Sequence, residues 1–246
     1  MTVHEAASRG FDREAAAYER GRPEYPGEAI AWLVKQAGLA TGRVVADIGA
    51  GTGKLTRALA ISGATLIAVE PVAGMREILA RRVPQARVID ATAEDLPLAD
   101  ASVDLVVVGQ AFHWFDGRRA LAEFARVLKR DGRLAIVYNR RDREDPLMRE
   151  LERIMVPYRR DTPSHRGEWR EAFKREGSFA LAGEVAVPFV ELRHRAELVD
   201  RVVSVSFIAA LPDAEKSAVR AEVQALAGES PVELRYISEV TLYKRS

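Results

Sequence analysis

Between Arg43 and Tyr138 the sequence alternates short apolar runs with amphipathic segments, and this pattern restricts the chain to few folds. The predicted strands are 43–47, 65–70, 87–90, 103–108 and 133–138, and the predicted helices between them are 54–61, 75–82 and 118–128. Regular alternation of strands and helices predicts an α/β fold in which helices cover both faces of a parallel sheet. The run VDLVVV at Val103–Val108 is nearly continuous in apolar residues, which is typical of a central strand.

Composition excludes several classes of function. The 246 residues, of which 48% are hydrophobic, suffice for one α/β domain. Lys and Arg number 37 against 36 Asp and Glu, so net charge gives no general attraction to nucleic acid or membranes. The absence of cysteine excludes disulfides, thiolate zinc sites and a Cys nucleophile. Because no apolar run approaches the ~20 residues of a membrane span and no signal-type segment opens the chain, we expect a soluble cytoplasmic protein. We also expect no metal site.

The loop DIGAGTG at Asp47–Gly53 follows a predicted strand and opens a predicted helix. Its glycines allow a sharp turn and a close approach of the backbone to a ligand. A P-loop is excluded, because Ile48 and Leu55 stand where it needs Gly and Ser or Thr. The dinucleotide fingerprint G-x-G-x-x-G is one residue longer than the G-x-G-x-G of this chain, and Asp47 would lie close to the pyrophosphate of a bound dinucleotide. A ligand with an ammonium group and no phosphate fits better, which favours S-adenosylmethionine (SAM) over NAD.

Two further markers follow the second and third strands. Glu70 ends its strand 21 residues after Gly49, where an acidic side chain can accept both hydroxyls of a ribose. Taken alone, Glu70 fits NAD as well as SAM, and it fits an ordinary solvated strand end. The segment DATAEDLP at Asp90–Pro97 is the third marker.

With these markers the chain resembles the class I SAM-dependent methyltransferases. The motifs VADIGAGTGKLTRAL, AVEP, ATAEDLPLADASVDLVV and RVLKRDGRLAIV occur in the order of that family and cover Val44–Tyr138. The upstream FDREAAAYERGRPEYP and the segment QAFHWFD at Gln110–Asp116 are similar to a small-molecule subgroup that includes trans-aconitate methyltransferase-like proteins. The resemblance implies a Rossmann-like, doubly wound, mostly parallel seven-stranded sheet.

The family pattern implies roles for individual residues. The implied cofactor-binding residues are Tyr18, Arg22, Asp47, Gly49, Ala50, Gly51, Glu70, Pro71, Met75, Thr92, Ala93, Glu94 and Gln110. Asp47 would fix the amino group of SAM directly or through water, and Glu70 would hold the ribose. Pro71 and Met75 would form an apolar wall of the adenine pocket. The family often has Asp or Asn where this chain has Thr92.

His113 is the candidate catalytic residue, as a general base or as a group that orients the methyl acceptor. The alternative is a structural histidine that stacks near Trp114. A carboxylate acceptor needs no base, whereas a phenol, an alcohol or an amine can need one. Arg22 could form a bidentate pair with a carboxylate, either that of SAM or that of the substrate.

The remaining segments are predicted to complete one domain over residues 1–246. We expect a helical cap at 1–40, the cofactor-binding core at 41–139, a helical insertion or partial lid at 140–177, and completion of the sheet at 178–246. Within these segments the predicted helices are 13–20, 27–37, 197–211 and 213–226, and the predicted strands are 184–190 and 232–243.

The sequence thus predicts an enzyme that transfers a methyl group from SAM to an oxygen, or a nitrogen, of a small organic acceptor, with S-adenosylhomocysteine (SAH) as the product. We expect a monomer or homodimer with no nucleic-acid or membrane partner. A methyltransferase acting on a macromolecule is disfavoured, because Gly109–Phe112 replaces the Asn-Pro-Pro-Tyr type of motif. A SAM-binding regulatory protein without catalysis stays open, and an NAD-dependent dehydrogenase is disfavoured by the glycine spacing.

Overall fold

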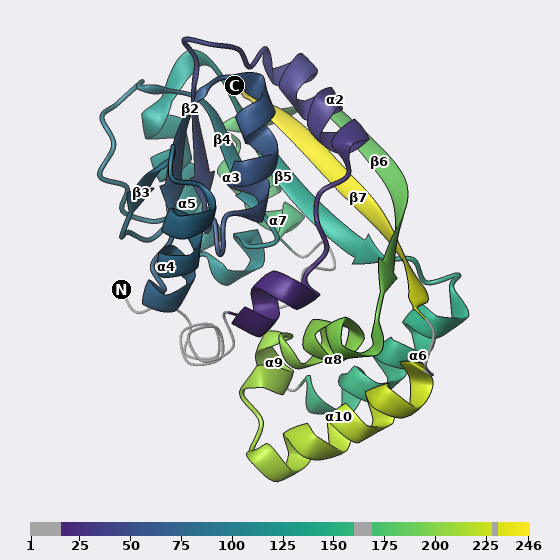
Figure 1. Ribbon diagram of the computed structural model, residues 1–246. Coiled ribbons are helices and arrows are strands. Elements are labelled where there is room, and N and C mark those ends of the chain that lie inside the picture. The colour runs from purple at the N-terminus through teal and green to yellow at the C-terminus, as the bar shows by residue number, and fades with distance from the viewer. Residues whose placement is uncertain (1–15, 160–168, 228–230) are drawn as a thin grey trace. The chain divides into compact units, whose positions relative to one another are not determined.

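The computed structural model describes residues 16–159, 169–227 and 231–246 (Figure 1). The chain divides into two compact units. The α/β unit comprises Tyr25–Asn139, Pro163–Val187 and Ser238–Ser246, and the helical unit comprises Met1–Glu24, Arg140–Thr162 and Pro188–Ile237. Residues 1–15 of the predicted cap lie outside the described residues, and residues 16–21 are helical.

The strands form one seven-stranded sheet in the order β3-β2-β1-β4-β5-β7-β6. Their bounds are β1 Val44–Ile48, β2 Thr65–Val69, β3 Arg87–Ile89, β4 Val103–Gly109, β5 Leu128–Arg141, β6 Phe179–Arg193 and β7 Val232–Arg245. The first five strands pair in parallel. β7 runs antiparallel to β5, since Arg245 donates to the carbonyl of Leu128 and the amide of Asp142 donates to the carbonyl of Arg235. The predicted fold class, a mostly parallel α/β sheet, is confirmed.

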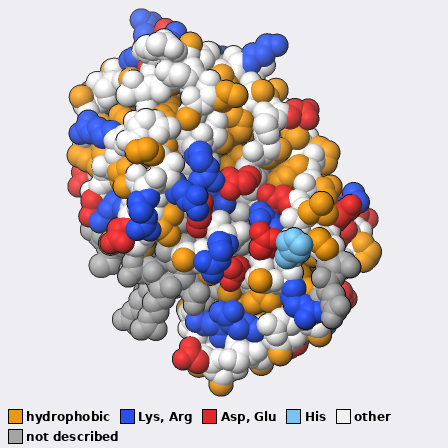
Figure 2. Space-filling view, in the orientation of Figure 1, with side chains coloured by type: hydrophobic (Ala, Val, Ile, Leu, Met, Phe, Trp, Pro, Cys, Tyr) orange, Lys and Arg blue, Asp and Glu red, His pale blue; other side chains and the backbone are white. Residues whose placement is uncertain are grey.

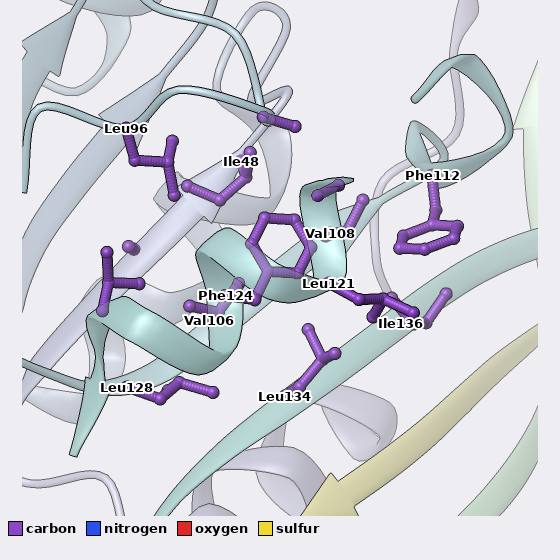
Figure 3. Close-up of a cluster of buried hydrophobic side chains, with 14 of the residues drawn as sticks. Ile48, Leu96, Val106, Val108, Phe112, Leu121, Phe124, Leu128, Leu134 and Ile136 are labelled. Carbon is purple, nitrogen blue, oxygen red and sulfur yellow. The ribbon is translucent and has the colours of Figure 1, made fainter. Parts of the chain in front are cut away.

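Helices of the α/β unit cover both faces of its strands. They are α2 Gly27–Ala37, α3 Lys54–Leu59, α4 Ala73–Arg82, α5 Gly117–Val127 and α7 Arg170–Glu176. Alternate strand residues pack on opposite faces because side chains of a strand alternate in direction. One cluster joins Ile48, Val106, Val108, Leu134 and Ile136 to Leu121 and Phe124 of α5 (Figure 3). The other joins Val45, Leu66, Leu105 and Val107 to Leu33 of α2, Leu59 of α3 and Leu79 of α4.

β5 begins earlier than the sequence predicts. The strand runs from Leu128, whereas the sequence predicts a turn at Asp131-Gly132 and a strand only from Arg133. Val103 pairs with Leu128 and Leu105 with Arg133, so the extra residues bulge out of the ladder. The predicted turn is therefore an irregularity within the strand pairing, which the local Asp-Gly signal does not distinguish from a turn.

The helical unit contains α6 Pro146–Met155, α8 Arg195–Val203, α9 Ser206–Ala209 and α10 Asp213–Ala227. Their apolar faces pack with Leu234 and Tyr236 of β7. The single helix predicted at 197–211 is two helices separated at Ser204-Val205. The predicted insertion at 140–177 is also divided, because α6 belongs to the helical unit while Trp169 and Phe173 join the core of the α/β unit. Among the described helices none is long and apolar enough to cross a membrane.

Candidate functional site

The glycine-rich loop connects the carboxyl end of β1 to α3. Gly49, Gly51 and Gly53 have φ of 70°, 58° and 86°, the left-handed region that glycine adopts without strain. The amides of Gly49 and Ala50 donate to the carbonyl of Val69, which fixes the loop at the carboxyl end of β2. A β-carbon on Gly49 would lie only 2.7 Å from that of Ala111, so the loop packs closely against the segment after β4.

Asp47 lies buried at the start of this loop, with 2% of its surface exposed. Its Oδ2 accepts a hydrogen bond of 2.6 Å from the Thr56 hydroxyl of α3, while its Oδ1 has no partner within the described chain. Burial raises the pKa of Asp47 to about 7, against the lowering effect of the Thr56 hydrogen bond, and the negative charge of Glu70 raises it further. A positively charged group at Oδ1 would compensate this buried carboxylate.

Glu70 follows β2 and is 6% exposed. Its carboxylate accepts hydrogen bonds from the amides of Gly51, at 2.8 Å, and Val72, at 2.9 Å. Burial raises the pKa of Glu70, although these two amides and Arg76 act in the opposite direction. Each carboxylate oxygen can accept more than one hydrogen bond, so acceptor capacity for a vicinal diol is left. The structure therefore brings the two predicted carboxylates, Asp47 and Glu70, to one loop.

The predicted adenine pocket is built from the segments after β2 and β3. Met75 and Ala93 are buried, whereas Pro71 and Thr92 are partly exposed. Glu94 is held at the start of α5, because its Oε1 accepts from the amide of Asp116 at 2.9 Å. These residues lie at the carboxyl ends of neighbouring parallel strands, where open α/β sheets bind ligands.

The segment after β4 contains Gln110 and His113. Gln110 has φ of 59°, which is rare for a residue with a side chain and is typical of functional sites. Its side-chain nitrogen donates to the carbonyl of Asn139 at 3.1 Å. Nδ1 of His113 lies 3.2 Å from the Tyr138 hydroxyl, and the His113 ring lies 4.8 Å from that of Trp114. Burial raises the pKa of Tyr138, so this hydroxyl stays neutral.

Two predicted cofactor residues belong to the helical unit. The guanidinium of Arg22 lies 4.8 Å from the centre of the Tyr18 ring, and its Nη2 donates to the carbonyl of Ser204 at 3.0 Å. Their contact with a cofactor stays a prediction.

Sequence reasoning missed two residues of the α/β unit. The Thr56 hydroxyl donates a hydrogen bond to Asp47. The sequence feature that could have indicated Thr56 is a hydroxyl in the first turn of the helix that follows the loop. The Tyr25 hydroxyl lies at the end of β4, where a β-carbon on Gly109 would approach it to 2.5 Å. No sequence pattern links Tyr25 to Gly109, since the contact joins distant parts of the chain.

The sheet order, the glycine loop after β1 and the acidic residue after β2 are typical of α/β proteins of the class I methyltransferase type. Residues 46–136 match the model of the methyltransferase domain family. An uncharacterized methyltransferase-like protein of Schizosaccharomyces pombe is 36% identical over 223 residues, which cover 90% of this chain and 87% of that protein. The chain therefore belongs to the SAM-dependent methyltransferases.

Two further comparisons concern a part of the sequence and the fold. An uncharacterized methyltransferase of Mycobacterium tuberculosis is 48% identical over 148 residues, and the match covers 60% of this chain and 59% of that relative. A solved candidate type II methyltransferase from Anaeromyxobacter dehalogenans shares the fold with a TM-score of 0.67 at 24% identity, over 90% of this chain and 97% of that one.

Proposed function

We propose that this protein transfers a methyl group from SAM to an oxygen, or a nitrogen, of a small organic acceptor. The observation that carries the proposal is the pair of buried carboxylates at the glycine loop, of which Asp47 has an oxygen without a partner in the described chain. SAM offers an ammonium group for Asp47 and a ribose diol for Glu70, and it has no phosphate for these carboxylates to repel. NAD lacks the ammonium group and carries a pyrophosphate.

The proposal gives the predicted residues the roles that the family resemblance implies. The residues that would hold SAM are Asp47 at the amino group, Gly49, Ala50 and Gly51 along the methionine, Glu70 at the ribose, Pro71, Met75, Thr92, Ala93 and Glu94 around the adenine, and Gln110 beside the sulfonium. A role of Tyr18 and Arg22 in cofactor binding is what the family resemblance implies. SAM supplies a methyl group on a sulfonium, which is already an activated leaving group. The protein contributes in-line alignment and exclusion of water, and alignment can supply roughly 7–11 kcal/mol of the barrier.

His113 is proposed as the base for an acceptor that carries a proton. If its Nδ1–H donates to the Tyr138 hydroxyl, Nε2 keeps a lone pair and can take a proton from a phenol or an alcohol. A carboxylate acceptor would need no base, and His113 would then orient it. The similarity of Gln110–Asp116 and of the upstream YERGRPEYP to trans-aconitate methyltransferase-like proteins supports a small acceptor.

Titration calorimetry with SAM, SAH and NAD tests the donor. We expect both sulfur nucleosides to bind with dissociation constants in the micromolar range and NAD not to bind. Tight binding of NAD would contradict the proposal.

Release of SAH with panels of carboxylates, phenols and amines tests the acceptor. SAM binding with no turnover on any panel would instead identify a regulatory SAM-binding protein. For an acceptor that carries a proton, His113→Gln should lower kcat about 100-fold or more and leave SAM affinity unchanged. Unchanged turnover of such an acceptor would reject the base.

A further inference from the structure

A second group of charges, of which Arg201 is buried and two other arginines are partly buried, lies within the helical unit and has the opposite sign. Arg201 comes from α8, Arg141 from the end of β5, and Arg22 from the segment after the first helical turn. The charges of Arg201 and Arg22 both act on Arg141, as does the hydroxyl of Tyr236 in β7. On the face drawn in Figure 2 basic and acidic side chains are interspersed over much of the surface. Arg201, which is buried, differs from this surface pattern.

Arg201 is 5% exposed and forms no ion pair within the described chain. Its Nε donates to the Tyr236 hydroxyl at 3.1 Å, and its Nη1 is buried without a partner among the described residues. The Tyr236 hydroxyl accepts that bond, so its own hydrogen can be donated to a further acceptor. Arg201 and Tyr236 together hold N–H and O–H groups for which the described residues provide no acceptor.

Arg141 is likewise poorly compensated. Its Nη2 donates to Sδ of Met155 at 3.5 Å, and a thioether is a weak acceptor. Burial, followed by repulsion from Arg201, lowers the pKa of Arg141 to about 9. Glu152 is the acid that acts on Arg141, and its effect is the smallest of the contributions. The Glu152 carboxylate also lies 4.0 Å from Nε of Arg143.

The backbone around these arginines is closely packed. A β-carbon on Gly21 would overlap the backbone of Asp200 and Arg201, so the chain at Gly21 rests directly on α8. The side chain of Arg22 then reaches the carbonyl of Ser204 at 3.0 Å, just after α8. Arg20 pairs with Asp200 at 2.7 Å beside it. Guanidinium groups held in place in this way lose little further conformational entropy when they bind a ligand.

We infer that Arg141, Arg201 and Tyr236 form an oxyanion-binding site that takes the carboxylate or phosphate group of a small organic acid. A buried guanidinium is costly unless it is paired, and a planar oxyanion can accept two parallel N–H bonds from it. The Tyr236 hydroxyl would add a third donor. Binding of the anion at this site does not depend on the proposed function.

Calorimetric titration of the full chain with succinate, citrate, inorganic phosphate and neutral succinamide tests the inference. We expect at least one oxyanion to bind and succinamide not to bind. Arg201→Met and Arg141→Met should each weaken oxyanion binding at least tenfold. Arg153→Met is the matched control, because Arg153 lies exposed on α6 in an ion pair with Glu150.

Binding of phosphate alone would identify a phosphorylated ligand, and binding of succinate or citrate would identify a carboxylic acid. The inference is overturned if no oxyanion binds, or if both variants bind as the parent does.

Two further measurements separate this site from a structural role and from the cofactor site. Thermal unfolding should show stabilisation by the oxyanion in the parent and in Arg153→Met, and not in Arg201→Met. If Arg201 had a purely structural role, its substitution would lower stability and leave the ligand-dependent shift intact. That result would overturn the inference. Affinity for SAM should be equal in parent and variants. A loss of SAM affinity would assign these arginines to the carboxylate of SAM itself and overturn the oxyanion site. Failure of SAM to bind the parent would contradict the proposed function alone.

Discussion

The two units of this protein hold charges of opposite sign that are compensated to different degrees: the buried carboxylates Asp47 and Glu70 in the α/β unit, and buried Arg201 with partly buried Arg141 in the helical unit. In the α/β unit both oxygens of Glu70 accept backbone amides, and Asp47 has one oxygen bonded to Thr56 and one without a partner in the described chain. In the helical unit Arg201 donates a hydrogen bond to one hydroxyl, and Arg141 donates one to a thioether. Uncompensated buried acids favour a cationic ligand, and uncompensated buried arginines favour an anionic one.

A third buried carboxylate shows that burial alone does not identify a binding site. Asp104 of β4 is 6% exposed, close to the values for Asp47 and Glu70. Although burial raises its pKa, hydrogen bonds from Lys129 and Arg43 bring the pKa of Asp104 below its usual range. Asp104 is therefore neutralised within the protein, whereas Asp47 is not. The missing opposite charge, rather than burial, separates a ligand site from a structural ion pair.

The pH dependence of stability gives the largest expected effect. The folded state holds a proton on Asp47 up to about pH 7, whereas the unfolded state releases it near pH ~4. This contribution to stability is complete below pH ~4 and is lost as the pH rises through 7. At about 1.4 kcal/mol for each pKa unit, the loss is about 4 kcal/mol. Asp47→Asn should therefore gain about that much stability relative to the parent between pH 4 and pH 8, as measured by urea unfolding.

Asp104→Asn provides the contrasting measurement. Because the pKa of Asp104 is lowered on folding, its contribution to stability is present above the unfolded pKa and is lost as the pH falls. Asp104→Asn should therefore lose stability relative to the parent as the pH rises, opposite to Asp47→Asn. If both variants showed the same slope, the distinction between the two carboxylates would be wrong.

Removal of Glu70 should have the next largest effect. Glu70→Ala deletes two charged acceptors proposed for the ribose, each worth roughly 1.5 kcal/mol, so SAM affinity should fall about 100-fold. Glu77→Ala, at an exposed position of α4, is the control and should bind SAM as the parent does. Calorimetry measures both. Equal affinity of Glu70→Ala and the parent would show that the ribose is held elsewhere.

Thr56→Val tests how far Asp47 depends on its single protein partner. The substitution keeps the shape of the side chain and removes the hydroxyl that donates to Oδ2 at 2.6 Å. A buried carboxylate that loses this bond should destabilise the fold by about 2 kcal/mol. Thr65→Val, at the exposed start of β2, should have little effect. Saturating SAM should leave Thr56→Val less stable than the parent, because the ammonium group would act at the other oxygen.

Much of the α/β unit could be predicted from the sequence, because its information is local. The strand runs, the glycine loop and Glu70 each carry a pattern within a few residues, and the structure places them as expected. Thr56 as the partner of Asp47 and Tyr25 beside Gly109 could not be predicted in this way. Those contacts depend on how the helices and strands pack, and the hydrophobic periodicity of the sequence does not predict them.

The helical unit was harder to predict for the same reason. Residues 140–177 read as one charged insertion, yet Arg141 belongs with Arg201 and Tyr236 while Trp169 belongs to the other core. Charge counts along this segment suggest a solvated surface, and they do not show which arginine is buried. Only the tertiary contacts distinguish Arg141, which is partly buried, from exposed arginines such as Arg143.

Arg20→Met should have the smallest effect and sharpens the comparison from the basic side. Arg20 pairs with Asp200, the residue before Arg201, at 2.7 Å, and its side chain is 58% exposed. Exposed ion pairs contribute roughly 0.2–1 kcal/mol, so urea unfolding of Arg20→Met should stay within about 1 kcal/mol of the parent. Its stabilisation by succinate, citrate or phosphate should equal that of the parent. A loss of that ligand response in Arg20→Met would mean that the net positive charge of this region, rather than the buried geometry of Arg201, attracts the anion.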